Sequence, residues 1–223
     1  KTNWSFGDGN TDTLLAPSHV YNSPGNYTVQ VIVLFSNNQR CTTSVTQPVK
    51  VFDLPKANFT LSVKDTMCIS SQLCLTNTSV PGSTGAPIRK ASFLFGDGTP
   101  VTNNNTPCHY YAKAGAYIIS LEVEDTNGCI ARIEKPFVVV EDVKTAILMS
   151  YSNCGPVRFI NASNMSQALT KRFYWDFGDG TFDSTNFSLA FHTYTDKTKC
   201  PFKAKLYIES KYGCWDDTFV TVC

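Results

Sequence analysis

The residues of this chain with the greatest capacity for chemistry are three histidines, nine cysteines and a recurrent aspartate. Histidine can act as a general base or metal ligand, and cysteine as a nucleophile, a ligand or half of a disulfide. All three histidines, however, occupy one position of a repeated motif, as His19, His109 and His192. A catalytic histidine would be special to one copy, and no Gly-x-Ser-x-Gly segment accompanies them. We therefore expect structural histidines and no enzyme activity.

A Gly-Asp-Gly triplet lies at the centre of the repeated motif. The triplets are Gly7-Asp8-Gly9, Gly96-Asp97-Gly98 and Gly178-Asp179-Gly180. Before them stand aromatic-x-Phe segments that open with Trp4, Phe93 and Trp175, and after them His-x-Tyr pairs that end with Tyr21, Tyr111 and Tyr194. Two glycines permit positive φ and a carboxylate can accept backbone N–H bonds, so we expect a turn that ends a strand. We expect each histidine to be partly buried and bonded to backbone, and each tyrosine to lie in the core. We also expect Trp4 and Trp175, as motif positions, to lie in the core.

The same aspartates leave a cation site as the alternative. Asp179 with Asp183, or Asp8 with Asp12, would supply its carboxylates. The second copy has Val101 in place of the second acid, and calcium sites usually take more carboxylates than this. We therefore expect no cofactor, with calcium as the alternative.

The motif divides the chain into three repeats. Successive triplets are 89 and 82 residues apart, which suits whole small domains in tandem. We place the repeats at 1–53, 54–142 and 143–223. About 40 residues precede the triplet in the second and third repeats but not in the first. We therefore expect the first repeat to be truncated, with its first strands N-terminal to Lys1, and the chain to be a piece of a longer polypeptide.

Strand patterns dominate each repeat. Apolar and polar residues alternate after Tyr27, Tyr117 and Phe202, which indicates half-buried strands. No stretch of a dozen residues keeps a helical period, while turn signals recur at short intervals. The chain is 42% apolar, which is enough to build cores. The pattern predicts an all-β protein of tandem immunoglobulin-like β-sandwiches arranged as an extended rod.

The cysteines indicate disulfides in an exported protein, because none forms a Cys-x-x-Cys pair. In the third repeat a hairpin centred near 211.5 would place Cys200 opposite Cys223, which leaves Cys154 with Cys214. By analogy we expect two pairs in the second repeat, although four cysteines allow three connectivities. Those pairs are Cys68 with Cys129 and Cys74 with Cys108. The ninth, Cys41, would find its partner upstream of Lys1.

Aromatic-x-Phe-Gly-Asp-Gly, followed by His-x-Tyr and an alternating strand, resembles the PKD domain family. The resemblance covers all three repeats, with Phe93 in place of the usual Trp and Cys200-Pro201-Phe202 in place of Gly-x-Tyr. A cysteine just after the hairpin turn, as in Asn127-Gly128-Cys129, is similar to cell-surface PKD arrays of Bacteroidota, including gliding-motility adhesins and type IX secretion cargo. The resemblance implies an extracellular or cell-surface location and carbohydrate or protein ligands.

The charge balance argues against two classes of partner. Nineteen basic and 18 acidic residues leave a net charge of +1, so the chain lacks the excess positive charge that binding to nucleic acid or an anionic membrane requires. No apolar run is long enough for a transmembrane helix. Trp215, just after a hairpin turn, is either a core residue or a ligand contact. We expect a non-catalytic adhesin, fibre or stalk segment that contacts neighbouring repeats; the alternative is an accessory region of a secreted protease or chitinase.

Overall fold

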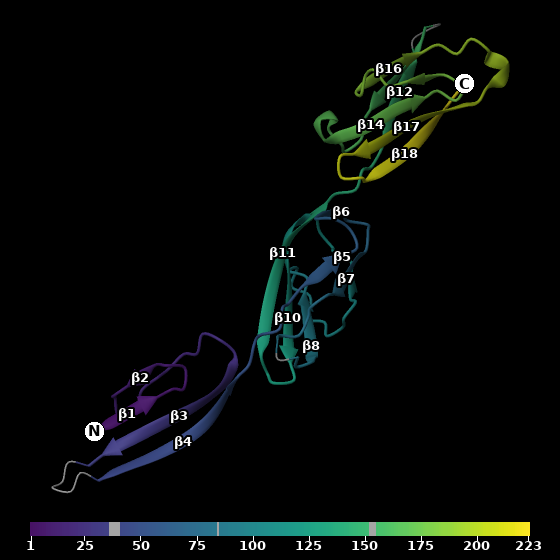
Figure 1. Cartoon of the computed structure of the whole chain (residues 1–223). Helices are drawn as coiled ribbons and strands as arrows, with labels where there is room; N and C mark the ends of the chain where they lie inside the picture. The colour runs from purple at the N-terminus through teal and green to yellow at the C-terminus, as the bar shows by residue number, and fades with distance from the viewer. Residues whose placement is uncertain (36–40, 84, 152–154) are drawn as a thin grey trace.

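Three β-rich repeats follow one another in an extended row (Figure 1). The computed structural model describes residues 1–35, 41–83, 85–151 and 155–223. Across these residues there is no α-helix, only two short 3-10 turns, η1 (Gln167–Leu169) and η2 (Lys197–Lys199). Nothing helical in the described segments is therefore long and apolar enough to span a membrane. The expectation of an all-β chain of sandwiches in a row is confirmed.

The second repeat is a sandwich of two sheets. One sheet has the strand order β6-β11-β10-β8, and the other has the order β5-β7-β9. The strands are β5 (Phe59–Leu61), β6 (Thr66–Cys68), β7 (Leu73–Asn77), β8 (Ile88–Leu94), β9 (Cys108–His109), β10 (Gly115–Asp125) and β11 (Ile130–Val140). Alternate residues of both sheets point inward, and Phe59, Phe93 and Leu121 are wholly buried there.

The third repeat has the same architecture. Its sheets have the orders β15-β14-β17-β18 and β12-β13-β16. The strands are β12 (Ile147–Tyr151), β13 (Val157–Asn161), β14 (Thr170–Asp176), β15 (Phe182–Asp183), β16 (Leu189–His192), β17 (Phe202–Ser210) and β18 (Trp215–Val222). Trp175, Phe159 and Leu206 are wholly buried between them.

The described residues of the first repeat form one sheet, in the order β2-β1-β3-β4. Its strands are β1 (Thr2–Ser5), β2 (Thr11–Asp12), β3 (Gly25–Leu34) and β4 (Thr42–Val51). Trp4 and Val31 are only half-buried, whereas their counterparts Trp175 and Leu206 in the third repeat are fully buried. The expectation that Trp4 lies in a core is therefore wrong for this chain, because no second sheet within the described residues covers it.

Each repeat contains a long β-hairpin. In the second repeat a short strand pairs in parallel with one edge of this hairpin. β10 pairs with β11 across the turn at Gly128, and β17 with β18 across the turn at Gly213. In the third repeat Phe202 lies opposite Val222, one residue from the register expected from the cysteines. β6 runs parallel to the end of β11, so that Cys68 lies beside Val140 at the end of the sandwich.

Candidate functional site: a disulfide-bonded junction between repeats

The Gly-Asp-Gly turns have the same geometry in all three repeats. One carboxylate oxygen of Asp8, Asp97 or Asp179 accepts the backbone N–H two residues later, at 3.0, 3.1 and 3.1 Å. The other oxygen lies 2.7 Å from the Nε2 atom of His19, His109 or His192. The turn that ends a strand is therefore observed, and its aspartate also fixes the histidine.

Each histidine has a partner that was not expected from the sequence. The prediction of a bond to backbone is wrong, because the imidazole bonds to the aspartate instead. Each ring also stacks on the phenylalanine before the triplet, with centroids 4.1 to 4.3 Å apart. The tyrosine hydroxyl donates to the carbonyl of that same phenylalanine at 2.9 Å in every repeat. Tyr111 is buried as expected, whereas Tyr21 and Tyr194 are half-buried.

These contacts stabilise the ionised carboxylates. Burial opposes ionisation of Asp179, but hydrogen bonds from Thr181 and His192 outweigh it and hold the pKa of Asp179 below its ordinary value. The pKa values of Asp8 and Asp97 are lowered by the same balance. Desolvation of Tyr111, reinforced by the charge of Asp97, raises the pKa of that phenol. The phenol therefore stays a hydrogen-bond donor.

The aspartate and histidine side chains of each repeat bond to each other at the turn. Both oxygens of Asp179 are engaged locally, and Asp183 accepts the amide and hydroxyl of Thr185 in a turn of its own. Over the described ranges no three His, Cys, Asp or Glu side chains gather as metal ligands would. The expectation of no cofactor, with calcium as the alternative, stays a prediction.

Two disulfides lie within single repeats, as the sequence predicts. Cys74 bonds to Cys108 between β7 and β9, with Cα atoms 4.0 Å apart. Cys200 bonds to Cys223, with Cα atoms 5.2 Å apart. Each of these two bonds therefore lies within one repeat.

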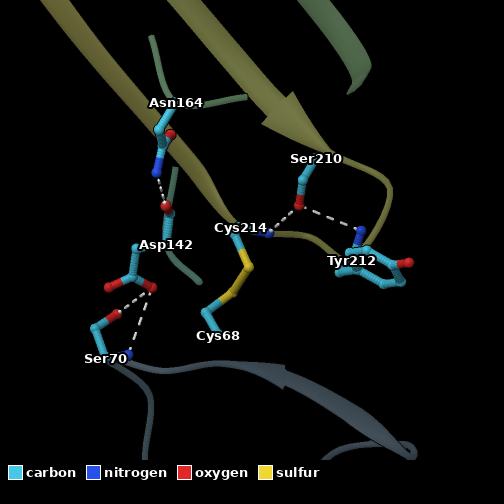
Figure 2. The surroundings of a disulfide bond; sticks show 7 residues. All are labelled: Cys68, Ser70, Asp142, Asn164, Ser210, Tyr212 and Cys214. Carbon is cyan, nitrogen blue, oxygen red and sulfur yellow. Dashed lines mark hydrogen bonds between the residues drawn. A yellow bond between two sulfur atoms is a disulfide. The ribbon is translucent and has the colours of Figure 1, made fainter. Parts of the chain in front are cut away.

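The third disulfide of the described residues joins two repeats. Cys68 of the second repeat bonds to Cys214 of the third, with Cα atoms 5.7 Å apart and a separation of 146 positions in sequence (Figure 2). The predicted pairs Cys68–Cys129 and Cys154–Cys214 are therefore wrong. Cys154 itself lies outside the described residues.

Strand geometry explains why Cys68 and Cys129 do not meet. β6 places Cys68 beside Val140, the last residue of β11, whereas Cys129 immediately precedes the first residue of that strand. Eleven residues of extended strand measure about 35 Å at roughly 3.3 Å per residue, so the two cysteines lie at opposite ends of the repeat. The end that carries Cys68 meets the β17–β18 turn of the third repeat.

Hydrogen bonds surround this disulfide on both sides (Figure 2). The Asp142 carboxylate in the linker accepts from the hydroxyl and the amide of Ser70, at 3.0 and 3.4 Å. The Asp142 carbonyl accepts from the Asn164 side chain at 2.9 Å. In the third repeat the Ser210 hydroxyl accepts the Cys214 amide at 3.1 Å. The linker is thus bonded to the repeat on either side of it.

The linker also continues directly into the third repeat. Val143 is 4% exposed and packs in the core of that repeat. The Asp216 carboxylate, two residues after Cys214, accepts the Thr145 amide at 2.7 Å. No flexible spacer therefore separates the two sandwiches.

Trp215 lies on the surface at this junction. Its side chain is 63% exposed and stacks on Tyr207, with centroids 6.0 Å apart. With Cys68, Asp142 and Cys214 it lines a shallow polar hollow between the two repeats. Of the two interpretations drawn from the sequence, the core position is wrong, and the exposed position that a contact residue needs is observed.

The repeated Gly-Asp-Gly turn is consistent with the family that a comparison with known proteins identifies. The family model described as PKD domain matches residues 1–51 and 59–140. The chain belongs to the PKD domain family. PKD domains are generally non-catalytic modules and often occur in surface or secreted proteins. PKD domains with disulfides are typical of extracellular proteins. The third repeat lies outside the matched residues, but its Asp179–His192 contact and its Tyr194 hydrogen bond are equivalent to contacts in the two matched repeats.

Solved structures similar to this PKD chain come from several sources. The PKD1 domain of the Vibrio cholerae metalloprotease PrtV is 27% identical, covers 39% of this chain and 96% of its own, and has a TM-score of 0.34. The PKD1 domain of Vibrio anguillarum Epp is 24% identical, covers 40% and 95%, and also has a TM-score of 0.34. Three N-terminal domains of the bacteriophage RB49 Highly Immunogenic Outer Capsid protein are 11% identical, cover 98% and 84%, and have a TM-score of 0.48.

Proposed function

We propose that this chain is a non-catalytic structural and binding segment of a large secreted cell-surface protein, such as an adhesin, fibre or stalk. Its domains are PKD repeats at 1–53, 54–142 and 143–223, and each repeat has its neighbours in the same polypeptide as partners. The cysteine after the hairpin turn favours a surface array of the Bacteroidota type, which includes gliding-motility adhesins and cargo of type IX secretion.

The observation that carries the proposal is the covalent junction between the second and third repeats. A disulfide from Cys68 to Cys214 keeps the two sandwiches joined even when the noncovalent contacts between them break. Asp142 adds hydrogen bonds along the linker. An accessory domain that only tethers a catalytic unit needs no such bond, whereas a rod that projects a tip under load does. The junction therefore favours a load-bearing array.

The binding part of the proposal concerns the outer face of the third repeat. There Trp215 and Phe219 are 63% and 54% exposed, and Tyr207 stacks between Trp215 and Tyr174. Exposed aromatic side chains are enriched where proteins bind partners. The matching positions of the second repeat hold Ile130, Glu134, Glu122 and Ser92, so the fold does not require aromatic residues there. A carbohydrate or protein ligand at the cell surface would contact this face.

The test is the mass and domain content of the native polypeptide, purified from its source without reductant. A mass many times the 24.6 kDa of this chain, with further repeat peptides after digestion, is the expected result. A mass only modestly larger, with peptides of a protease or chitinase catalytic domain, would replace the proposal by the accessory role.

A further inference from the structure

Cys129 occupies in the second repeat the place that Cys214 occupies in the third. Each follows a glycine of positive φ at the tip of the long hairpin, +83° and +86° respectively. The Cys129 amide donates to the Asp125 carboxylate at 2.9 Å, and the Cys214 amide donates to the Ser210 hydroxyl at 3.1 Å. The two tips therefore share one backbone geometry, although only Cys214 has a disulfide partner among the described residues.

The two hairpin tips also face the same way along the row. The β17–β18 tip points back to the second repeat, where Cys68 meets it, and the β10–β11 tip points back to the first repeat (Figure 1). A cysteine placed in the first repeat as Cys68 is placed in the second would therefore meet Cys129.

The first repeat has an open position for the strand that would carry such a cysteine. In the second repeat β11 pairs with β10 on one side and with the parallel strand β6 on the other, at Val138–Val140. In the first repeat β4 corresponds to β11, and within the described residues it pairs with β3 alone. The far edge of β4 is free to accept a parallel strand near Val51, and an unpaired edge readily adds a strand.

The surroundings of Cys129 give a further indication that something is missing at this tip. Asp125 is fully buried, and one of its carboxylate oxygens, Oδ2, has no hydrogen-bond partner within the described structure. A buried polar atom without a partner is rare and costly. A disulfide has no hydrogen-bond donor, so the group that completes this site would be a donor on the polypeptide that brings the partner cysteine. Burial, together with the Asp125 charge, raises the pKa of the Cys129 thiol. The raised pKa keeps this thiol protonated at neutral pH.

We propose that Cys129 forms a second inter-repeat disulfide, with a cysteine on the β6-like strand of the first repeat, in polypeptide N-terminal to Lys1. The inference deepens the proposed array function and rests on it. The two thiols lose two electrons and two protons to a disulfide oxidant, a small molecule or an oxidoreductase, which leaves as two thiols. Each repeat then gives one cysteine to the next repeat and receives one from the repeat before it.

The test is a disulfide map of the native polypeptide, with free thiols alkylated before digestion without reductant. The expected product joins the Cys129 peptide to a peptide N-terminal to Lys1, and the Cys68–Cys214 peptide in the same digest shows that the junctions survived. An alkylated Cys129 would overturn the inference, as would a bond to a second copy of the chain or to another protein.

Two matched variants of the native polypeptide sharpen the test. Cys129→Ser is expected to expose one new alkylatable thiol N-terminal to Lys1, whereas Cys214→Ser exposes only Cys68. No new thiol upstream in the Cys129→Ser protein would contradict the inference. If the native polypeptide contains further repeats but Cys129 is alkylated, the disulfide proposed for Cys129 is wrong and the proposed array function is unaffected. If the polypeptide contains a catalytic domain in place of further repeats, the proposed array function is wrong, whatever the state of Cys129.

Discussion

Two glycines of one turn provide a matched pair of substitutions, Gly178→Ala and Gly180→Ala. Both residues have positive φ, +78° and +93°, so an alanine at either costs about 1–2 kcal/mol. A Cβ at Gly180 would meet no atom within 4 Å. A Cβ at Gly178 would lie 2.5 Å from the carbonyl oxygen and 2.9 Å from the nitrogen of Lys203 in β17, and forcing that backbone aside adds about 1–3 kcal/mol.

The assay is native-state hydrogen exchange of β17 (Phe202–Ser210), with β10 (Gly115–Asp125) of the second repeat as internal reference. The difference of about 1–3 kcal/mol predicts that Gly178→Ala speeds β17 exchange about 5- to 150-fold more than Gly180→Ala does. Exchange in β10 should stay unchanged in both variants. Equal exchange of β17 in the two variants would refute the close approach of this turn to the hairpin.

The remaining predictions concern the junction, the aspartates and the tyrosines. Replacing both Cys68 and Cys214 by serine should increase the bending between the second and third repeats in small-angle X-ray scattering, whereas loss of a disulfide within one repeat should not. Because the pKa of Asp179 is lowered in the folded chain, its contribution to stability is complete above the ordinary value of 3.8 and is lost as pH falls through the folded value; acid melting curves of Asp179→Asn should therefore lose that pH dependence. Tyr194→Phe should destabilise the third repeat by about 1 kcal/mol in thermal melting, since a backbone carbonyl loses its donor; an unchanged melting curve would show that water replaces the hydroxyl.

The sandwiches and their turns could be predicted from the sequence because they depend on local patterns. Alternating residues around Tyr117 and Phe202 specify strands with one buried face, and the Gly-Asp-Gly triplet specifies a turn through the φ values of its glycines. The Cys200–Cys223 bond followed from hairpin symmetry, and a register one residue away from the expected one still allowed it. The aspartate–histidine bond was missed although the nearly constant spacing of the two residues could have indicated it.

The junction could not be predicted in the same way, because it depends on how two repeats meet. β6 is three residues long and joins its sheet in parallel, so the sequence contains no hairpin pattern that would indicate where β6 places Cys68. The assumption that every repeat closes its own cysteines then gave the wrong pairs. One signal was present: the positions of Cys74 and Cys108 are taken in the third repeat by Arg158 and Phe191, so the cysteines of the two repeats do not follow one scheme.

The most direct test of the account is to identify the peptide bonded to Cys214 in the unreduced 223-residue chain. Mass spectrometry of an unreduced digest should find Cys214 joined to Cys68 across the junction of the second and third repeats. A bond from Cys214 to Cys154, within the third repeat, would contradict the covalent junction and with it the main argument for a load-bearing array.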